Sequence, residues 1–307
     1  MTALANERVA FFNGQIVPES QVVIPFRDSG FMSGDAGFDT TRTFNQRIFK
    51  LDEHLARFMR TLRYLRIEPH MDLATMKAIT IDVFERNRHL LGPHEDFWVS
   101  QRWSRGGDKW AGDKGTTPTM IIECSPLPYA SRAALFRDGI DVTVPSIRRT
   151  PPDSMSPRAK THNYLNLILA DQEVKARDPN GWAVLLDHNG NLTEGLGSNF
   201  FIVSNGALVT PKANFVLPGI SRETVIDLAR AEGIEIVEAD IDLFDAYNAD
   251  EAFLTSTSLC ICPVRRVNGA AVAEQRIPGP VTQKLIDAYA RLVDCDFVAQ
   301  YLHHLPG

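Results

Sequence analysis

The stretch that decides the fold is WAVLLDHNGNLTEGLGSNFFIV, residues 182–203. Apolar runs at its two ends flank the dipeptide Asn189-Gly190, and a third run follows at 207–210 after Asn205-Gly206. Asn-Gly favours tight hairpin turns because both residues tolerate positive φ. The pattern therefore predicts a three-stranded meander with two tight hairpins.

The sequence on either side of this meander alternates helix and strand signals. Downstream, Pro218-Gly-Ile-Ser221 is expected to open a helix with Ser221 as its N-cap, and Gly233 to close it. Upstream, a Pro-rich loop precedes a helix that begins near Asn163. Further strands are predicted at 141–144, 235–238 and 252–255.

The first 125 residues also alternate helix and strand signals. Turn signals predict hairpins over 8–18 and 38–50, and a stripe of four leucines and Phe58, spaced three and four residues apart, predicts a helix over 51–65. A helix over 73–91 and strands at 97–103 and 119–123 complete this half. Because prolines then interrupt the pattern, we expect an N-terminal domain over 1–125, a linker over 126–136 and a C-terminal domain over 137–307.

Length and composition exclude several classes of protein. The chain has 307 residues, 44% hydrophobic and 23% charged, which is typical of a folded globular protein of two domains. Its net charge of −6 disfavours a nucleic-acid partner, and no apolar run is long enough to predict a signal peptide or a membrane span. Four cysteines fit a reducing cytoplasm. We therefore expect a cytoplasmic enzyme.

Familiar catalytic and metal motifs are absent from the chain. Gly195-Leu-Gly197 lacks the third glycine of a dinucleotide-binding turn, and Asp113 replaces the lysine of a phosphate-binding loop. Cys260-Ile-Cys262 is too closely spaced for zinc, and the His-Glu-x-x-His and Gly-x-Ser-x-Gly motifs do not occur. No metal site is predicted.

Four other features together indicate one chemistry. They are the amine of Lys160 before a helix, the carboxylate of Glu194 after a tight turn, and Arg57 beside an apolar helix stripe. The fourth is a pair of hydroxyl and N–H clusters suited to a phosphate, at Gly219–Ser221 and Thr255–Ser258. Each has an ordinary structural interpretation when taken alone, as a solvated lysine, a strand-edge glutamate, a snorkelling arginine, a helix cap and a polar turn. Taken together they match the needs of pyridoxal 5'-phosphate, whose aldehyde, pyridine nitrogen and phosphate require an amine, an acid and an anion site.

The chain resembles the class IV (fold type IV) pyridoxal-phosphate aminotransferases, which include the branched-chain, D-amino-acid and (R)-amine transaminases. The resemblance rests on five ordered motifs: His54-Leu-Ala-Arg57-Phe, Lys160-Thr-His-Asn-Tyr164-Leu, Leu186–Phe201, Leu217-Pro-Gly-Ile-Ser221-Arg222 and Ala249–Thr257. It implies an α/β (α+β) fold with a small N-terminal α/β domain, a larger C-terminal domain with a β-barrel core, and a homodimer with its active site at the interface.

The resemblance also assigns roles residue by residue. Lys160 would be the Schiff-base lysine that shuttles a proton in a ping-pong transamination, and Glu194 would bind the pyridine nitrogen. Arg57 would bind the phosphate together with Ile220, Ser221 and Thr257, and Tyr164 would lie near the phenolic oxygen of the ring.

The substrate is less closely defined by the resemblance. Phe38, Arg42, Arg105 and Ser258 are candidates for the substrate pocket, with the two arginines as carboxylate ligands. The branched-chain enzymes carry a tyrosine and an arginine on the strand that here reads Trp98-Val99-Ser100, and the loop that holds the Arg-x-His of the D-amino-acid enzymes here contains Asp108-Lys-Trp110. The sequence therefore favours an (R)-amine or D-amino-acid transaminase. A branched-chain aminotransferase, an aminodeoxychorismate-type lyase and a non-enzymatic binding protein remain alternatives.

Overall fold

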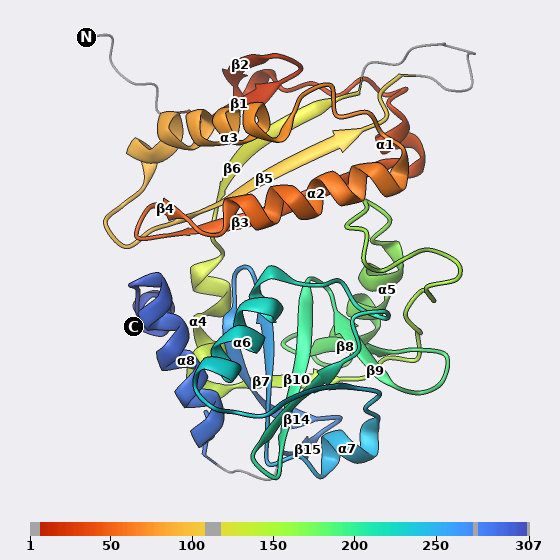
Figure 1. Cartoon of the computed structure of the whole chain (residues 1–307), viewed down its shortest axis with the longest axis vertical. Coiled ribbons are helices and arrows are strands. Elements are labelled where there is room, and N and C mark those ends of the chain that lie inside the picture. The colour runs from red at the N-terminus through yellow and green to blue at the C-terminus, as the bar shows by residue number, and fades with distance from the viewer. Residues whose placement is uncertain (1–6, 108–117, 273–275, 306–307) are drawn as a thin grey trace. The chain divides into compact units, whose positions relative to one another are not determined.

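A computed structural model describes residues 7–107, 118–272 and 276–305 (Figure 1). The chain divides into two compact units. The first consists of Met1–Leu127 with Ala159–Asn163, and the second of Pro128–Arg158 with Tyr164–Gly307. Five residues that include Lys160 thus belong to the first unit although they lie far along the sequence.

The first unit is built on a six-stranded sheet of order β2-β1-β6-β5-β3-β4. All of its strand pairs are antiparallel. The strands are β1 (Val9–Phe12), β2 (Gln15–Pro18), β3 (Ala36–Phe44), β4 (Arg47–Ile48), β5 (Phe97–Ser104) and β6 (Met120–Pro126). Both predicted hairpins, β1–β2 and β3–β4, are confirmed.

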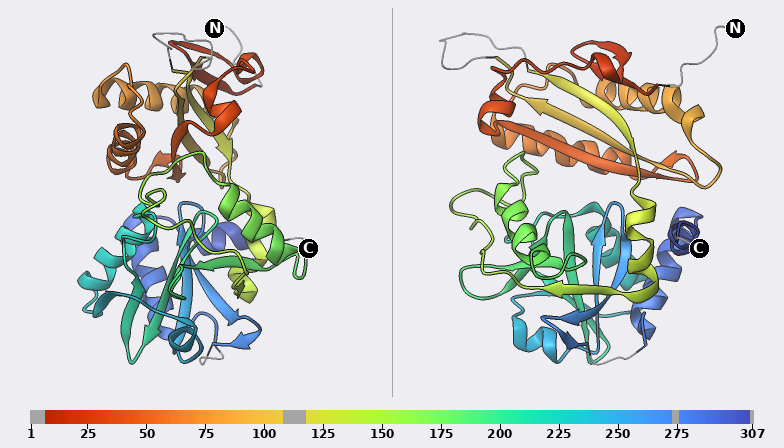
Figure 2. Two further views of the ribbon diagram at one scale, coloured as in Figure 1. Left: turned by 90° about the vertical axis from the view of Figure 1, so that its right-hand side faces the viewer. Right: turned by 180° about the vertical axis from the view of Figure 1, so that it is seen from behind.

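Two long helices lie on one face of this sheet, as the left view of Figure 2 shows. The helical segments of the first unit are η1 (Glu19–Gln21), α1 (Ser29–Ser33), α2 (Leu51–Leu65), α3 (Leu73–Asn87) and η2 (Arg88–Leu90). The leucine stripe of α2 is buried, with Leu55, Phe58 and Leu62 at 1% exposure or less. This stripe packs with Val99 and Trp103 of β5 into one apolar core, so α2 has a fixed position on the sheet.

The second unit contains a closed barrel. Its nine strands follow the order β12-β11-β10-β13-β14-β7-β8-β9, with β15 on β14, and a further pairing of β9 with β10 closes six of them into a ring. The strands are β7 (Ile140–Thr143), β8 (Trp182–Leu186), β9 (Leu192–Gly195), β10 (Ser198–Ser204), β11 (Ala207–Pro211), β12 (Ile236–Ala239), β13 (Glu251–Ser256), β14 (Cys260–Val267) and β15 (Ala270–Ala271). The expected β-barrel core is confirmed.

Helices surround this barrel (Figure 1). They are α4 (Tyr129–Asp138), α5 (Leu165–Lys175), α6 (Ile220–Ala231), α7 (Leu243–Tyr247), α8 (Pro280–Val293) and α9 (Phe297–Leu302). Helix α5 packs against β8, while α6 and α8 pack against β13. No helix within the described ranges is long and apolar enough to cross a membrane.

Three sequence predictions differ from this structure. The meander contains an extra strand, since β9 lies between β8 and β10 and pairs with both of them. The expected linker over 126–136 holds α4, because β6 ends at Pro126 and helix-forming alanine, arginine and leucine follow Pro128, the N-cap of the helix. Ser221 lies inside α6, whose N-cap is Gly219, because the extended backbone of Gly219 ends the Pro-Gly turn two residues earlier.

Candidate active site

Lys160 is held in the first unit by its own backbone. Its N–H donates to Thr61 Oγ1 at 3.1 Å, and its carbonyl accepts from the N–H of Phe38 at 2.9 Å. Its amine nitrogen Nζ lies 4.5 Å from the centre of the Phe38 ring. Since Thr61 belongs to α2 and Phe38 to β3, these two elements set the position of the amine.

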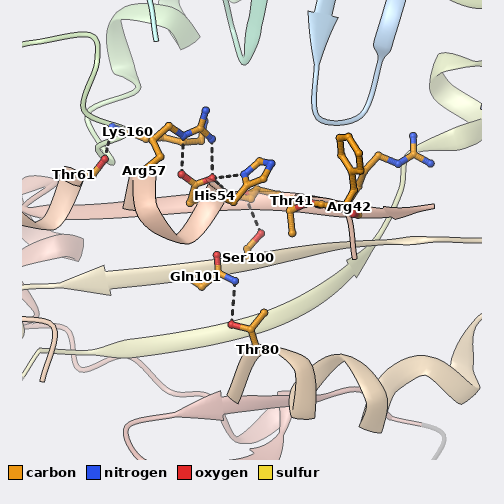
Figure 3. Close-up of polar contacts among 12 residues, drawn as sticks. Thr41, Arg42, His54, Arg57, Thr61, Thr80, Ser100, Gln101 and Lys160 are labelled. Atoms are coloured by element: carbon orange, nitrogen blue, oxygen red, sulfur yellow. Dashed lines mark hydrogen bonds and ion pairs between the residues drawn. The ribbon is translucent and has the colours of Figure 1, made fainter. Parts of the chain in front are cut away.

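Arg57 and His54 bind a common carboxylate from β3 (Figure 3). The Arg57 guanidinium donates two hydrogen bonds to Asp39, Nε to Oδ2 at 2.8 Å and Nη2 to Oδ1 at 2.7 Å. The Nδ1 atom of His54 lies 2.8 Å from Asp39 Oδ1. All three side chains are buried, with exposures of 3% or less. A bidentate pair of this kind fixes the plane of the guanidinium as well as its position.

The charges in this cluster are balanced. Burial alone would raise the pKa of the Asp39 carboxyl, but the Arg57 guanidinium and the hydrogen bond from His54 hold that pKa well below its ordinary value. Burial lowers the pKa of His54, although its hydrogen bond to Asp39 acts in the other direction. The cluster therefore consists of one anion, one cation and a neutral ring, a combination that burial tolerates.

In the second unit, Glu194 is buried on β9 and has two partners. Its Oε1 accepts from Arg149 Nε at 3.0 Å, and its Oε2 accepts from the backbone N–H of Leu217 at 2.9 Å. It is thus a buried, ion-paired carboxylate and not the solvent-facing strand-edge glutamate of the simpler interpretation.

The loop that Glu194 binds leads directly into helix α6. Asn199 Nδ2 donates to the carbonyl of Leu217 at 3.0 Å, and a side chain added at Gly219 would collide with Asn199 Oδ1. Among the described residues, no side chain caps the N-terminus of α6, where Ile220 and Ser221 lie in the first turn. Uncapped N–H groups at the start of a helix are suited to binding an anion. The carboxylate and this anion site therefore belong to one hydrogen-bonded assembly.

The remaining predicted cofactor residues also lie in the second unit. Thr257 follows the end of β13, and Tyr164 is the residue before α5. The hydroxyl of Ser258 accepts from an Nη1–H of Arg132, and its carbonyl accepts from Tyr301 at 2.7 Å. Ser258 is thus fixed in place by two side chains.

Both arginines predicted to bind a substrate carboxylate have other contacts. Arg42 is 1% exposed, lies against the Phe44 ring and has Asp96 at 3.7 Å. Arg105 donates to Asp35 at 2.7 Å and also to the carbonyls of Leu65 and Arg66 at the end of α2. Both guanidinium groups therefore have structural roles in the first unit. The Asp108-Lys-Trp110 segment lies outside the described residues.

Sequence reasoning missed the residues that hold these groups. His54 lies three residues before Arg57 on one helix face, a spacing that offers a signal. Asp39 and Arg149 offer none, because each meets its partner only through the tertiary fold. Within the described residues, no cluster of three or more His, Cys, Asp or Glu side chains is arranged to hold a metal.

Comparisons with known proteins agree with one another. A family model described as amino-transferase class IV matches residues 36–267. A Methanocaldococcus jannaschii protein, provisionally named a branched-chain-amino-acid aminotransferase, is 33% identical over 284 residues, which cover 91% of this chain and 94% of that protein.

Solved structures of similar proteins lead in the same direction. The Escherichia coli branched-chain amino acid aminotransferase superposes with a TM-score of 0.86 at 28% identity, covering 94% of this chain and 95% of that one. The branched-chain aminotransferase of Thermoproteus uzoniensis, solved with norvaline, gives a TM-score of 0.83 at 27% identity and covers 98% of both chains.

Proposed function

Because the chain belongs to the class IV aminotransferases, we propose that it binds pyridoxal 5'-phosphate through Lys160 and transaminates branched-chain amino acids. The class is pyridoxal-phosphate-dependent, and its members move an amino group between an amino acid and a 2-oxo acid. The resemblance predicted from the five motifs is thereby confirmed at the level of the family. The cofactor and the substrate of this chain remain our proposal.

The choice of substrate reverses the preference drawn from sequence alone. The relatives and solved structures reported above carry branched-chain names, and none of them is named for an (R)-amine or a D-amino acid. Trp98 and Ser100 depart from the branched-chain pattern, but the full-length similarity outweighs two positions. We therefore favour the branched-chain alternative.

The observation that carries the proposal is the chemistry of two sets of polar side chains, one in each unit. The first unit offers an amine with an ion-paired guanidinium, and the second offers an ion-paired carboxylate bonded to the loop that begins an uncapped helix. Amine, guanidinium, carboxylate and N–H cluster are the donor and acceptor set that pyridoxal phosphate needs. When bound, the cofactor supplies an electrophilic carbon and an electron-withdrawing ring.

Each residue then has a defined task. Lys160 Nζ would hold the cofactor and would be the base that moves a proton to and from the substrate carbon. The Glu194 carboxylate would bind the pyridine nitrogen and keep it protonated. Arg57, with the N–H groups of Ile220 and Ser221 and the side chain of Thr257, binds the phosphate. Tyr164 would lie near the phenolic oxygen of the ring.

A half-reaction screen tests this proposal. The cofactor-loaded enzyme is mixed separately with L-leucine, D-alanine and (R)-1-phenylethylamine, and the absorbance band of the bound cofactor is followed. We expect L-leucine to bleach the band at the lowest concentration, and adding a branched-chain 2-oxo acid to restore it, as in a ping-pong cycle. Bleaching by (R)-1-phenylethylamine or D-alanine without L-leucine would contradict the branched-chain assignment. Release of pyruvate from aminodeoxychorismate, with no amino acceptor present, would indicate a lyase.

A further inference from the structure

We infer that Arg102, which the sequence did not single out, binds the carboxylate of the substrate. This inference rests on the proposed function and names the group that separates amino acids from simple amines. It starts from a requirement of the reaction. The carbon that loses its amine next to Lys160 carries the carboxylate directly, so a guanidinium that binds this carboxylate must lie close to the Lys160 amine.

Arg102 meets this requirement through Phe38. The two residues lie opposite each other in the β3–β5 register. The Arg102 guanidinium carbon lies 5.2 Å from the centre of the Phe38 ring, and Lys160 Nζ lies 4.5 Å from the same centre. One aromatic ring therefore contacts both the amine that reacts and a guanidinium.

The register of β3 with β5 shows on which face of the sheet Arg102 lies. Phe38 pairs with Arg102, Thr40 with Ser100, and Arg42 with Trp98. Successive side chains of a strand point to opposite faces, so these residues share the face opposite to that of Asp39 and Gln101. Arg102 thus projects from the same face as Ser100, displaced by one two-residue step along β5.

Three other arginines of the first unit are held by closer or more numerous partners. Arg57 has Asp39 at 2.7 Å, Arg105 has Asp35 at 2.7 Å with two carbonyls, and Arg42 is almost fully buried against Phe44. Arg102 has Glu123 at 3.5 Å, a long separation for a charge-assisted hydrogen bond, and its side chain is 38% exposed. Its guanidinium therefore keeps the capacity to bind a carboxylate in a bidentate manner.

His162 adds a second observation at the same place. Its ring contacts Phe38 edge-on, with the centroids 5.4 Å apart. Its Nε2 atom is buried and has no hydrogen-bond partner among the described residues. A buried polar atom without a partner is costly. A carboxylate bound at Arg102 beside Phe38 would supply an acceptor for this atom in the tautomer that carries its proton on Nε2.

The test compares two substrates that differ only in the carboxylate, L-leucine and 3-methylbutylamine. In Arg102→Gln, we expect the KM for L-leucine to rise tenfold to about a hundredfold, the loss typical of a charge-assisted pair, while kinetics with the amine change less than about threefold. The KM of Arg102→Lys for L-leucine should lie between those of the wild-type enzyme and Arg102→Gln, because lysine keeps the positive charge but lacks the planar guanidinium that binds a carboxylate through two hydrogen bonds. Arg86→Gln, an exposed arginine of α3 paired with Asp82, is the matched control and should leave both substrates unchanged.

A binding measurement separates recognition from turnover. The dissociation constant of 4-methylpentanoate for the cofactor-loaded enzyme should rise at least tenfold in Arg102→Gln, and that of 4-methylpentanamide should stay the same. If Arg102→Gln does not fold, Glu123→Gln provides the test: removing the competing acid should lower the KM for L-leucine by up to about fivefold and leave the amine unaffected.

The outcomes distinguish this inference from the proposed function. If the wild-type enzyme transaminates L-leucine and Arg102→Gln leaves its KM unchanged, or weakens L-leucine and 3-methylbutylamine equally, Arg102 is not the carboxylate ligand while the proposed function stands. If the wild-type enzyme neither binds pyridoxal phosphate nor transaminates amino acids, both are overturned.

Discussion

In the first unit, Arg57 and His54 bind the buried carboxylate of Asp39, whereas in the second unit Glu194 divides its carboxylate between Arg149 and a backbone N–H. The first arrangement is a closed cluster of three side chains from one strand and one helix. The second ties a side chain to the loop that begins α6. The first therefore depends on charge balance and the second on the path of the backbone. Substitutions should damage the two in different ways.

The largest effect should come from the amine of the first unit. Lys160→Ala removes Nζ but leaves the two backbone hydrogen bonds that fix the segment, so we expect a folded protein whose transamination rate falls on the order of a thousandfold or more. Steady-state rates and a thermal unfolding curve check both parts. Lys77→Ala, an exposed lysine paired with Asp52, serves as the control. Substantial turnover by Lys160→Ala would refute the assigned role.

The next effect tests the charge balance. Asp39→Asn leaves the Arg57 guanidinium buried without its counterion, so we expect the free energy of unfolding to fall by about 3–5 kcal/mol and the cofactor affinity to fall with it. Urea unfolding and a pyridoxal-phosphate titration measure the two quantities. Asp52→Asn, which breaks an exposed pair, should change neither of them. Equal stability of the two variants would mean that the cluster carries no charge penalty.

A third prediction tests the dependence of the second unit on its backbone path. In Gly219→Ala, the added Cβ collides with Asn199 Oδ1 and displaces the start of α6, so stability should fall by about 1–3 kcal/mol and the cofactor should bind more weakly. The double variant Gly219→Ala, Asn199→Ala removes the collision and should recover part of the loss. If the two substitutions prove additive in urea unfolding, the collision is not the cause.

The smallest effect is a dependence on pH that arises in the first unit. Burial, together with the positive charge of Arg102, lowers the pKa of His162 to about 4 from its ordinary value of 6.5. The folded protein favours the neutral ring, so this contribution to stability is present above pH 6.5 and is lost as the pH falls toward 4. Between pH 7 and pH 5.5 the loss should be about 1 kcal/mol. In urea unfolding, the free energy of unfolding of His162→Asn should change by about 1 kcal/mol less than that of the wild type between pH 7 and pH 5.5. An identical change in both proteins would contradict this role of His162.

The sequence predicted the elements of both units better than their buried contacts. Local signals were enough for the Asn-Gly turns and for the leucine stripe of α2, because turn geometry and helix periodicity are properties of neighbouring residues. The short strand β9 was missed because its four residues lie between two stronger apolar runs. The helix α4 was missed because two prolines mark its start.

In the candidate site, too, the sequence indicated single functional residues but not the partners that the tertiary fold brings to them. Lys160, Arg57 and Glu194 could be singled out by chemistry and motif, but their partners Asp39 and Arg149 lie 18 and 45 residues away from them in the chain. Arg102 was overlooked because its position beside Phe38 depends on the register of β3 with β5, which no local signal specifies.

The most direct test of the central claim locates the cofactor on the chain. The purified enzyme is loaded with pyridoxal phosphate, reduced with borohydride, digested and mapped by mass spectrometry. We predict that the pyridoxyl phosphate is fixed to the peptide that contains Lys160. Attachment to a different lysine, or no attachment at all, would contradict the account.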